Sequence, residues 1–435
     1  MTNDSFDLAV IGGGINGCGI ARDAAGRGLS VVLIEQGDIA SATSQWSSKM
    51  VHGGLRYLEH YEFRLVRESL REREVLLKLA PHLIEPAEFI VPHDRSMRPA
   101  WMVRAGLLLY DHLGGHISLP RSRRIEFPDP RYSAALKPVF ARGFLYSDTR
   151  VDDARLTLAN ALSARDKGAV VRVGCKLRSG ERAGHGWRLT VRARGQARDE
   201  VLQARGVVNA AGPWVKAVLD DALHVASDAT VRLVKGSHIV VPRIHEFAHA
   251  YLLQNDDQRV IFVIPYEGRF TLIGTTDVAI SALDEARAIS PDETAYLLRA
   301  VNRYLAKPLR ERDIVWSYAG VRPLYDDGQG DPSAITRDYV FRLEAAGTSS
   351  PLLSVFGGKL TTYRKLAEHA LEQLAPYYPR LGPPWTAKAA LPGGAFDDRG
   401  EALRALQAQH PRLPADFLER LFRRHGSNAG IVLEG

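Results

Sequence analysis

A glycine-rich turn between a short apolar run and a helix of small residues constrains this chain more than any other feature. Phe6-Asp-Leu-Ala-Val-Ile11 is typical of a buried strand, and Gly12-Gly-Gly-Ile-Asn-Gly17 follows it directly. A helix over 18–26 and a second strand over 29–35 complete a β-α-β unit of about 30 residues. In this context the turn indicates a dinucleotide-binding site.

The glycines of the turn have separate physical tasks. Gly12 permits the tight turn, Gly14 lets backbone N–H groups approach a pyrophosphate, and Gly17 lets the helix pack closely on the strand. Glu35 ends the second strand, where its carboxylate would accept a hydrogen bond from a ribose 2′-hydroxyl and repel a 2′-phosphate. FAD or NAD is therefore favoured over NADP. The alternative is an ordinary turn beside a solvated Glu35.

Length and composition exclude several other classes. The chain has 435 residues, which is too long for one compact core, and its 45% hydrophobic and 25% charged residues are typical of globular proteins. A net charge of +7 favours acidic partners without choosing among them. Two cysteines, Cys18 and Cys175, are too few for a disulfide framework or a four-thiolate metal site, so we expect a reducing compartment and no metal. The sequence has no P-loop, which argues against a kinase or ATPase.

Two polar, glycine-containing segments are candidate parts of a site. The hydroxyl-rich run 41–49 leads into Met50-Val-His-Gly-Gly-Leu-Arg-Tyr57, where hydroxyls can donate to phosphate and the glycines allow close backbone approach. Gly357-Gly358-Lys359 precedes a helix over 363–375, whose N-terminal dipole would stabilise the anion of a reduced flavin. The alternatives are a polar loop before a helix and a simply capped helix.

Cationic residues beside turns form a third group. Arginine suits a phosphate bidentately and lysine acts as a compact charge. Most arginines of this chain must lie on solvated faces, but a few stand in apolar or glycine-rich sequence, where an unpaired charge is costly to bury. His238 is either a general base or a buried core residue. The cations are Arg56 beside Tyr57, Lys235 near His238, Arg322, Arg337 and Lys359.

The pattern along the chain predicts two interleaved units of α/β type. A helix over 151–167, a strand over 169–173, a hairpin over 187–205 and a strand over 206–212 continue the layered dinucleotide unit. Strand-rich segments over 232–241 and 258–278 suit an antiparallel sheet inserted into it. From about residue 396 the chain is charged and helical.

Several strings, taken in order, resemble the FAD-dependent aerobic glycerol-3-phosphate dehydrogenases of bacterial respiratory membranes. The resemblance runs from the first strand to about residue 394. Its strings are Ile11–Gly17, Ser47-Ser-Lys-Met-Val-His-Gly-Gly-Leu-Arg-Tyr-Leu-Glu59, Lys235-Gly-Ser-His-Ile-Val-Val-Pro242, Ile273-Gly-Thr-Thr-Asp277, Gly320-Val-Arg-Pro-Leu324 and Phe356-Gly-Gly-Lys-Leu-Thr-Thr-Tyr-Arg364.

The resemblance implies a fold and a domain arrangement. We expect a Rossmann-like FAD domain of the glutathione-reductase type over 1–80, 150–230 and 345–385. An inserted antiparallel-sheet substrate domain is expected over 81–149 and 231–344, resembling that of D-amino-acid oxidase. Because such enzymes carry a longer helical C-terminal domain, 386–435 is expected to be a short helical segment, a truncated cap.

The resemblance also implies a reaction and partners. The reaction is oxidation of sn-glycerol 3-phosphate to dihydroxyacetone phosphate by hydride transfer to FAD, with electrons passed to ubiquinone. The resemblance implies a homodimer that lies on the cytoplasmic face of the inner membrane and does not bind nucleic acid. The enzyme alternatives are a glycerol-3-phosphate oxidase or a D-amino-acid-oxidase-type oxidase using O2. A non-catalytic FAD-binding, membrane-associated protein is the alternative from another class.

The expected site residues fall into three sets. The substrate phosphate is assigned to Arg56, Tyr57, Arg322 and Lys359, with Thr275 as a weaker candidate for orienting substrate or ring. The catalytic set is His238, Arg337, Arg322 and Lys359, and which group removes the proton stays open because His238 could instead contact the flavin. FAD is assigned to Gly12, Gly14, Ile15, Asn16, Gly17, Glu35, Gln36, Thr43, Ser44, Ser47, Ser48, Lys49, His52, Gly54, Ala211, Gly212, Gly358, Leu360 and Thr361.

Membrane contact is a separate question. No apolar run reaches the roughly 18 to 20 residues of a membrane-spanning helix, and the acidic start is unlike a signal peptide. We therefore expect a chain that does not cross a bilayer. The amphipathic stretch 99–113, with basic flanks, could lie on a membrane surface, but a core helix explains the same pattern and is the favoured interpretation.

Overall fold

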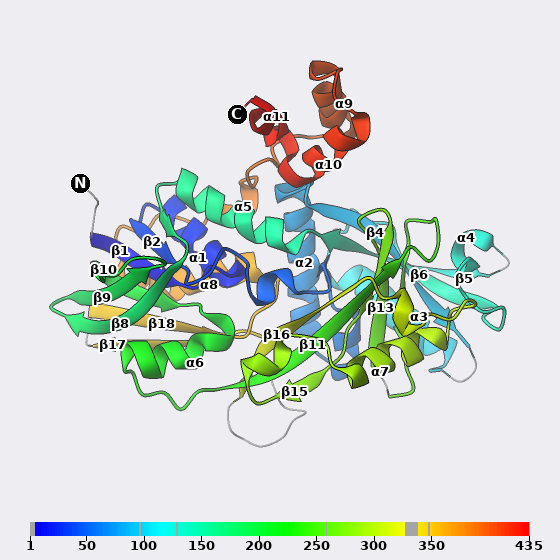
Figure 1. Ribbon diagram of the computed structural model, residues 1–435, viewed down its shortest axis with the longest axis horizontal. Coiled ribbons are helices and arrows are strands. Elements are labelled where there is room, and N and C mark those ends of the chain that lie inside the picture. The colour runs from blue at the N-terminus through cyan, green and yellow to red at the C-terminus, as the bar shows by residue number, and fades with distance from the viewer. Residues whose placement is uncertain are drawn as a thin grey trace.

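The computed structural model of the protein describes residues 5–94, 97–127, 129–257, 259–326, 338–346 and 349–434. Two β-sheets lie side by side, each with helices against it, and helices α9–α11 stand together at one end (Figure 1). The chain passes between the sheets several times. Segments that are far apart in sequence therefore meet where the sheets adjoin.

The first sheet has a parallel centre with the strand order β18-β10-β1-β2-β7. Its central strands are continuous apolar runs, as expected where both faces are covered. Helices α1 (Ile15–Gly26), α5 (Asp153–Asp166) and α8 (Tyr363–Leu374) share one hydrophobic core with it. The strands are β1 (Ser5–Ile11), β2 (Val31–Ile34), β7 (Val170–Arg172), β8 (Cys175–Ala183), β9 (Gly186–Ala193), β10 (Glu200–Asn209), β17 (Val340–Ala346) and β18 (Ser349–Phe356).

The second sheet is antiparallel except for the parallel pair β12 and β4 among the described strands. Helix α7 (Pro291–Asn302) packs on one face, and α2 (Phe63–Leu79) and α3 (Ala100–Leu113) pack on the other. The strands are β3 (Met50–Val51), β4 (Ile84–His93), β5 (Arg123–Glu126), β6 (Arg142–Val151), β11 (Thr230–Pro242), β12 (Ala250–Gln254), β13 (Val260–Tyr266), β14 (Phe270–Gly274), β15 (Val278–Ile280) and β16 (Trp316–Asp326).

Shorter helices complete the molecule. The short helices α4 (Pro130–Ser133) and α6 (Val215–Ala217) lie in connections. Helices α9 (Arg399–Gln409), α10 (Ala415–His425) and α11 (Ala429–Glu434) form a small core of their own around Leu418 and Phe422. Arg155 of α5 donates to the Arg424 carbonyl at 2.9 Å, which connects helices α9–α11 to a helix of the first sheet.

Most elements expected from the sequence are present with shifted ends. Helix α1 begins at Ile15 instead of residue 18, because Gly14 is its N-cap and Gly17 already lies in its first turn. The expected hairpin over 187–205 and strand over 206–212 share one strand, β10. Strand β8, which pairs with β9, was not expected. The domain boundaries given above stay a prediction.

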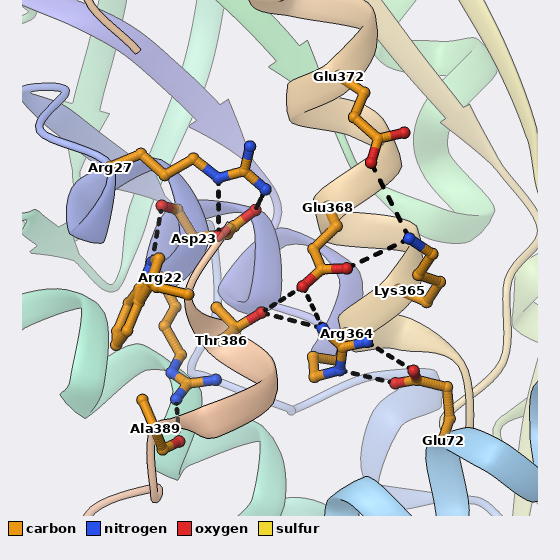
Figure 2. Close-up of polar contacts among 11 residues, drawn as sticks. Arg22, Asp23, Arg27, Glu72, Arg364, Lys365, Glu368, Glu372, Thr386 and Ala389 are labelled. Carbon is orange, nitrogen blue, oxygen red and sulfur yellow. Dashed lines mark hydrogen bonds and ion pairs between the residues drawn. The ribbon is translucent and has the colours of Figure 1, made fainter. Parts of the chain in front are cut away.

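A buried polar cluster joins α1 and α8, which pack on the first sheet, to α2, which packs on the second (Figure 2). Arg364 of α8 donates to both carboxylate oxygens of Glu72 in α2, from Nη2 at 2.6 Å and from Nε at 2.8 Å. It also pairs with Glu368, which accepts from Thr386 Oγ1 at 3.2 Å. On α1, Arg22 Nη2 donates to the Ala389 carbonyl at 2.7 Å. Thr386 and Ala389 belong to one short segment, which therefore connects α8 to α1. These contacts fix α8, and thus the turn before it, relative to α1 and α2.

Candidate active site

A cavity of about 950 Å³ is lined by elements of both sheets. The first sheet contributes the turn between β1 and α1, the end of β2 and the end of β10. The turn before α8 lies beside the first of these, because Asn16 Nδ2 donates to the Gly357 carbonyl at 3.1 Å. The second sheet contributes β11, β16 and the loop after β14, and residues of the hydroxyl-rich segment 41–57 also line the cavity.

The glycine-rich end of the cavity is shaped by close backbone contacts. Gly12 has φ +111°, and a Cβ added there would lie 2.5 Å from the Ala210 carbonyl oxygen. A Cβ on Gly17 would lie 1.9 Å from the Gly12 carbonyl oxygen, because helix α1 starts directly on the turn. The Ile15 N–H donates to Ser44 Oγ at 2.9 Å, which holds the hydroxyl-rich segment over the turn. Only glycine fits at these two positions.

Glu35 is held rigidly at the same end. Its Oε2 accepts from the Gly13 N–H and its Oε1 from the Gly37 N–H, both at 2.6 Å. Each carboxylate oxygen has further acceptor capacity. A negative charge fixed at the end of β2 suits a ribose hydroxyl and disfavours a phosphate in its place.

The residues present therefore fit FAD. Gly17 is buried behind the wall, where its lack of a side chain lets α1 pack. The expected cofactor residues that line the cavity are Gly12, Gly14, Ile15, Asn16, Glu35, Gln36, Thr43, Ser44, Ser47, Ser48, His52, Gly54, Ala211, Gly212, Gly358, Leu360 and Thr361.

Lys49 does not line this cavity. Its ammonium lies 2.8 Å from the buried carboxylate of Asp153 and donates to the Gln45 carbonyl at 2.9 Å. Asp153 also accepts from Ser47 Oγ at 2.6 Å. Lys49 thus supports the hydroxyl-rich segment from behind. No local sequence pattern indicates this contact, because Asp153 is remote along the chain.

Part of the cavity wall carries positive charge, and we call it the cationic end. Its members are the expected substrate residues Arg56, Tyr57, Thr275, Arg322 and Lys359, which all line this one cavity. Lys359 Nζ lies 3.9 Å from the centre of the Tyr57 ring. Within the described ranges, no carboxylate lies at ion-pair distance from Arg56, which is half-buried. This end suits an anion with more than one negative charge.

Arg322 is oriented by its neighbours. Its Nη2 donates to the Thr276 carbonyl at 3.1 Å, and its Nη1 lies 3.6 Å from Asp277 Oδ1. Its side chain is 44% exposed, so the guanidinium remains reachable from the cavity. Arg337, which the sequence placed in the catalytic set, lies outside the described residues.

Two imidazoles line the cavity. His238 is buried, and its Nε2 lies 2.9 Å from Ser48 Oγ while its ring stacks on Tyr318. Burial, with Arg322 and Lys49 nearby, lowers the pKa of His238 to about 3. Burial lowers the pKa of His52 as well. The charge of Asp148 acts in the opposite direction, and the charge of Lys359 adds to the lowering. Both imidazoles are therefore uncharged at neutral pH.

Sequence reasoning missed part of the wall. Cys175, Lys176, Leu177 and Arg178 at the start of β8 line the cavity. The Cys175 N–H donates to the Glu35 carbonyl at 2.8 Å, so this strand begins directly beside the end of β2. The signal available in the sequence was the alternation of apolar and charged residues over 175–178, which is typical of a half-buried strand.

One sequence pattern resembles a zinc-binding motif but does not form a metal site. His245-Glu-Phe-Ala-His249 matches the spacing of two zinc-binding histidines around a glutamate. Here the pattern lies between β11 and β12 and not on a helix, and the two rings stack with centroids 4.5 Å apart. Stacked rings cannot aim their lone pairs at one ion. Among the described residues, no group of three or more His, Cys, Asp or Glu is arranged to hold a metal.

Comparison with known proteins agrees with this geometry. Residues 7–364 match the family described as FAD dependent oxidoreductase. The chain is 52% identical over 431 residues to the aerobic glycerol-3-phosphate dehydrogenase of Escherichia coli (strain K12), covering 99% of this chain and 85% of that one. It is 49% identical over 434 residues to the D-erythritol 1-phosphate dehydrogenase of Brucella abortus (strain 2308), covering 99% and 86%.

A solved structure extends the comparison to the fold. The glycerol-3-phosphate dehydrogenase from Bacillus halodurans complexed with FAD superimposes with a TM-score of 0.78 at 30% identity, covering 100% of this chain and 78% of that one. The fold and the glycine-rich end of the cavity thus define an FAD-dependent oxidoreductase, which confirms the expected fold class and cofactor. Within that class, the chain belongs to the family of the glycerol-3-phosphate dehydrogenases.

Proposed function

We propose that this protein oxidises sn-glycerol 3-phosphate to dihydroxyacetone phosphate. One observation carries the proposal: Arg56, Arg322 and Lys359, from three separate segments, line the cavity that also contains the FAD-binding glycines. Relatives named glycerol-3-phosphate dehydrogenase, at 52% and 53% identity, support the same substrate. A dianionic phosphate at the cationic end would leave the polyol part of the substrate facing the interior of the cavity.

The cations contribute by positioning. A charged anchor remote from the reacting carbon holds that carbon in a near-attack arrangement, so binding energy lowers the barrier to the chemical step. Arg322 offers a planar fork for two phosphate oxygens, whereas Lys359 offers a compact charge. Tyr57, packed under Lys359, restricts where that charge can lie.

Oxidation of a secondary alcohol removes a hydride from the carbinol carbon and a proton from its hydroxyl. FAD, when bound, supplies the hydride acceptor. The proton goes to a neutral imidazole of the wall, His238 or His52. The phosphate of the substrate favours this transfer, because its negative charge offsets the charge of Arg322 that disfavours protonation of His238.

Flavin bleaching of the purified holoenzyme under anaerobic conditions tests the substrate. We expect glycerol 3-phosphate to bleach the flavin, with D-alanine ineffective because the site is built for a phosphate. Bleaching by D-alanine alone would contradict the proposal. In the same assay, His238→Gln and His52→Gln identify the proton acceptor: the responsible variant slows bleaching without raising the concentration of glycerol 3-phosphate needed for half-saturation.

A second candidate substrate is D-erythritol 1-phosphate, because a relative at 49% identity carries that name. Both polyol phosphates would place their phosphate on the same cations. The ratio of kcat/KM for the two substrates decides between them. We expect the ratio to favour glycerol 3-phosphate, and a ratio favouring the four-carbon substrate would replace it in the proposal.

The electron acceptor is proposed to be ubiquinone. The L-alpha-glycerophosphate oxidase from Mycoplasma pneumoniae is a distant structural neighbour at 18% identity, and this likeness shows the fold alone. Oxygen uptake by the reduced enzyme, with and without a short-chain ubiquinone analogue, tests the acceptor. Fast oxidation by O2 without the analogue would favour an oxidase.

Attachment to a membrane surface is proposed from helix α3 and its neighbour η2 (Leu55–His60). The sequence favoured a core helix here, and Leu107 and Tyr110 of α3 are indeed buried in the core. On the other face, however, Trp101 is 70% exposed, and Met102, Leu108 and Leu109 are exposed too. Tyr61 and Phe63, just after η2, add exposed aromatic rings. Apolar and aromatic groups at the surface suit the interface of a bilayer. None of the helices in the described ranges is long and apolar enough to cross a membrane.

Sedimentation with vesicles containing anionic lipid tests this attachment. We expect Trp101→Ser with Leu108→Ser to weaken binding of the holoenzyme while its activity toward soluble substrate stays unchanged. Val201→Ser, at an exposed valine of β10, is the matched control and should leave binding unaltered. We propose that the membrane-bound form lies on the cytoplasmic face of the inner membrane. We also propose that the protein is a homodimer, and light scattering of the purified protein tests this.

A further inference from the structure

Glu293 is the third residue of helix α7, where it forms a capping box with Ser290. The Glu293 N–H donates to Ser290 Oγ at 3.2 Å, and Glu293 Oε2 accepts from the Ser290 N–H at 3.0 Å. A glutamate in a capping box needs no other partner for this task. The side chain of Glu293 is nevertheless only 6% exposed, and its carboxylate makes three further contacts inside the protein.

These three contacts come from the second sheet and the loop after β14. Oε2 lies 2.8 Å from the buried ammonium of Lys235. Oε1 accepts from the hydroxyls of Ser237 and Thr276, each at 2.7 Å. Burial alone would raise the pKa of Glu293, but hydrogen bonds from Lys235, Thr276 and Ser237 outweigh burial and lower the pKa to about 2. The carboxylate is therefore ionised, and it compensates the charge of Lys235.

The same contacts lead to the cationic end of the cavity. The Thr276 carbonyl accepts from Arg322 Nη2 at 3.1 Å and from Thr275 Oγ1 at 3.2 Å. The Ser237 N–H donates to Thr276 Oγ1 at 2.8 Å, which fixes the loop against β11. Glu293 is not among the described residues that line the cavity, so any influence on the substrate passes through Thr276.

Arg322 has a second, competing partner. Asp277 Oδ1 lies 3.6 Å from Nη1, and both side chains are partly exposed. If the Thr276 carbonyl moved away, the guanidinium would turn toward Asp277 or toward water, and its fixed orientation would be lost. A binding group that must be ordered again on each binding event binds more weakly.

We propose that Glu293 is a positioning residue that orients Arg322 for the phosphate of the substrate, through Thr276. This inference rests on the proposed function. It predicts that weakening the link between Glu293 and Thr276 reduces phosphate affinity although no phosphate-binding group has been changed.

Four variants of the holoenzyme test the proposal. In Glu293→Gln an amide replaces one carboxylate oxygen and the charge is lost; Thr276→Val removes the hydroxyl that Glu293 holds. We expect each variant to raise KM for glycerol 3-phosphate by about tenfold, because that is the effect of losing one hydrogen bond to a charged group. The change in kcat should be smaller. Thr276→Ser keeps the hydroxyl and should restore a near-normal KM. Ser290→Ala removes the helix cap but keeps the carboxylate, so it should lower Tm and leave KM unchanged.

Calorimetric titration with inorganic phosphate separates this inference from the proposed function. We expect Glu293→Gln and Thr276→Val to bind phosphate about tenfold more weakly than the wild type and Thr276→Ser. If phosphate affinity falls as expected but glycerol 3-phosphate does not reduce the flavin, the proposed substrate fails and the positioning role stands. Wild-type KM and phosphate affinity in both Glu293→Gln and Thr276→Val would overturn the positioning role, as would a wild type that binds no phosphate. If Glu293→Gln does not fold, the two Thr276 variants decide.

Discussion

The ammonium of Lys359 lies 3.9 Å from the centre of the Tyr57 ring. Tyr57 belongs to η2, and Lys359 belongs to the turn before α8, so this contact joins two segments that are remote in sequence. The ring is also packed against Gly54, where an added Cβ would lie 2.3 Å from Tyr57 Cδ2. Gly54 thus lets the ring lie flat beside the cavity, with its face toward the lysine.

This contact predicts different effects for two substitutions of Tyr57. Tyr57→Phe keeps the ring and should change KM for glycerol 3-phosphate by less than about twofold, because the cation–π attraction is retained. Tyr57→Leu removes the ring, and we expect KM to rise about fivefold, corresponding to the loss of about 1 kcal/mol of cation–π interaction. Steady-state kinetics with a dye acceptor measures both. Equal KM values for the two variants would show that the ring face is irrelevant.

The sequence predicted the members of this cationic end but not their arrangement. Arg56, Arg322 and Lys359 were selected because each stands in apolar or glycine-rich sequence, and all three line the cavity. What sequence could not supply is the partner of each charge. Lys49 is expected from the sequence to contact FAD, yet its partner is Asp153, on a different element. Partners of this kind depend on tertiary packing, which no local pattern encodes.

A methyl group added to the fingerprint should abolish cofactor binding. In Gly17→Ala the Cβ would lie 1.9 Å from the Gly12 carbonyl oxygen, so α1 and the turn before it could not both keep their places. We expect the purified variant to contain less than a tenth of the wild-type flavin, by absorbance. Gly106→Ala in α3, where nothing lies within 4 Å of the added Cβ, is the control. It should keep its flavin and gain about 0.5–1 kcal/mol of stability.

The fold was more predictable than the surface. The β1-α1-β2 unit follows from apolar runs and glycines that are adjacent in sequence, so local signals suffice. Helix α3 shows the limit: its amphipathic pattern predicted the helix, but whether the apolar face is covered depends on the neighbouring elements. The structure leaves Trp101 and Leu108 exposed. Strand β8 carries only a short alternation of apolar and charged residues over 175–178, and its pairing with β9 extends it to Ala183.

Stacked buried histidines predict loss of stability in acid. Burial and neighbouring charge lower the pKa of His245 to about 4 and of His249 to about 3, so both are neutral when folded at neutral pH. The unfolded chain binds protons near the ordinary pKa of 6.5, so it takes up more protons than the folded chain as pH falls below that value. Stability should therefore be full above about pH 6.5 and decline toward pH 3–4, by about 1.4 kcal/mol per pH unit for each histidine.

Denaturant unfolding at pH 7, 6 and 5 of the wild type and His249→Phe measures this contribution. We expect the free energy of unfolding to fall less steeply between pH 7 and 5 in the variant, because one site of differential protonation is gone. His224→Phe, at an exposed histidine, is the control and should keep the wild-type slope. The same slope in all three proteins would contradict the prediction.

Two arginines of similar local pattern should differ sharply in their contribution to stability. Arg364 and Arg420 each pair with a carboxylate one helical turn away, Glu368 and Asp416 respectively. Arg364 is buried and also donates to both oxygens of Glu72 (Figure 2). The side chains of Arg420 and Asp416 are 58% and 70% exposed. Removing a buried partner leaves carboxylates without compensation, and an exposed pair is already solvated.

We therefore expect Arg364→Met to lower the free energy of unfolding by about 3–5 kcal/mol and Arg420→Met by no more than about 0.5 kcal/mol. Because Arg364 fixes α8, and the turn before α8 carries Lys359, the first variant should also raise KM for glycerol 3-phosphate. Glu72→Gln with Arg364→Met should recover part of the stability, since one uncompensated charge is then removed. Urea denaturation of the holoproteins measures all of these values. Similar losses in the two single variants would show that the buried cluster carries no more stability than a surface ion pair.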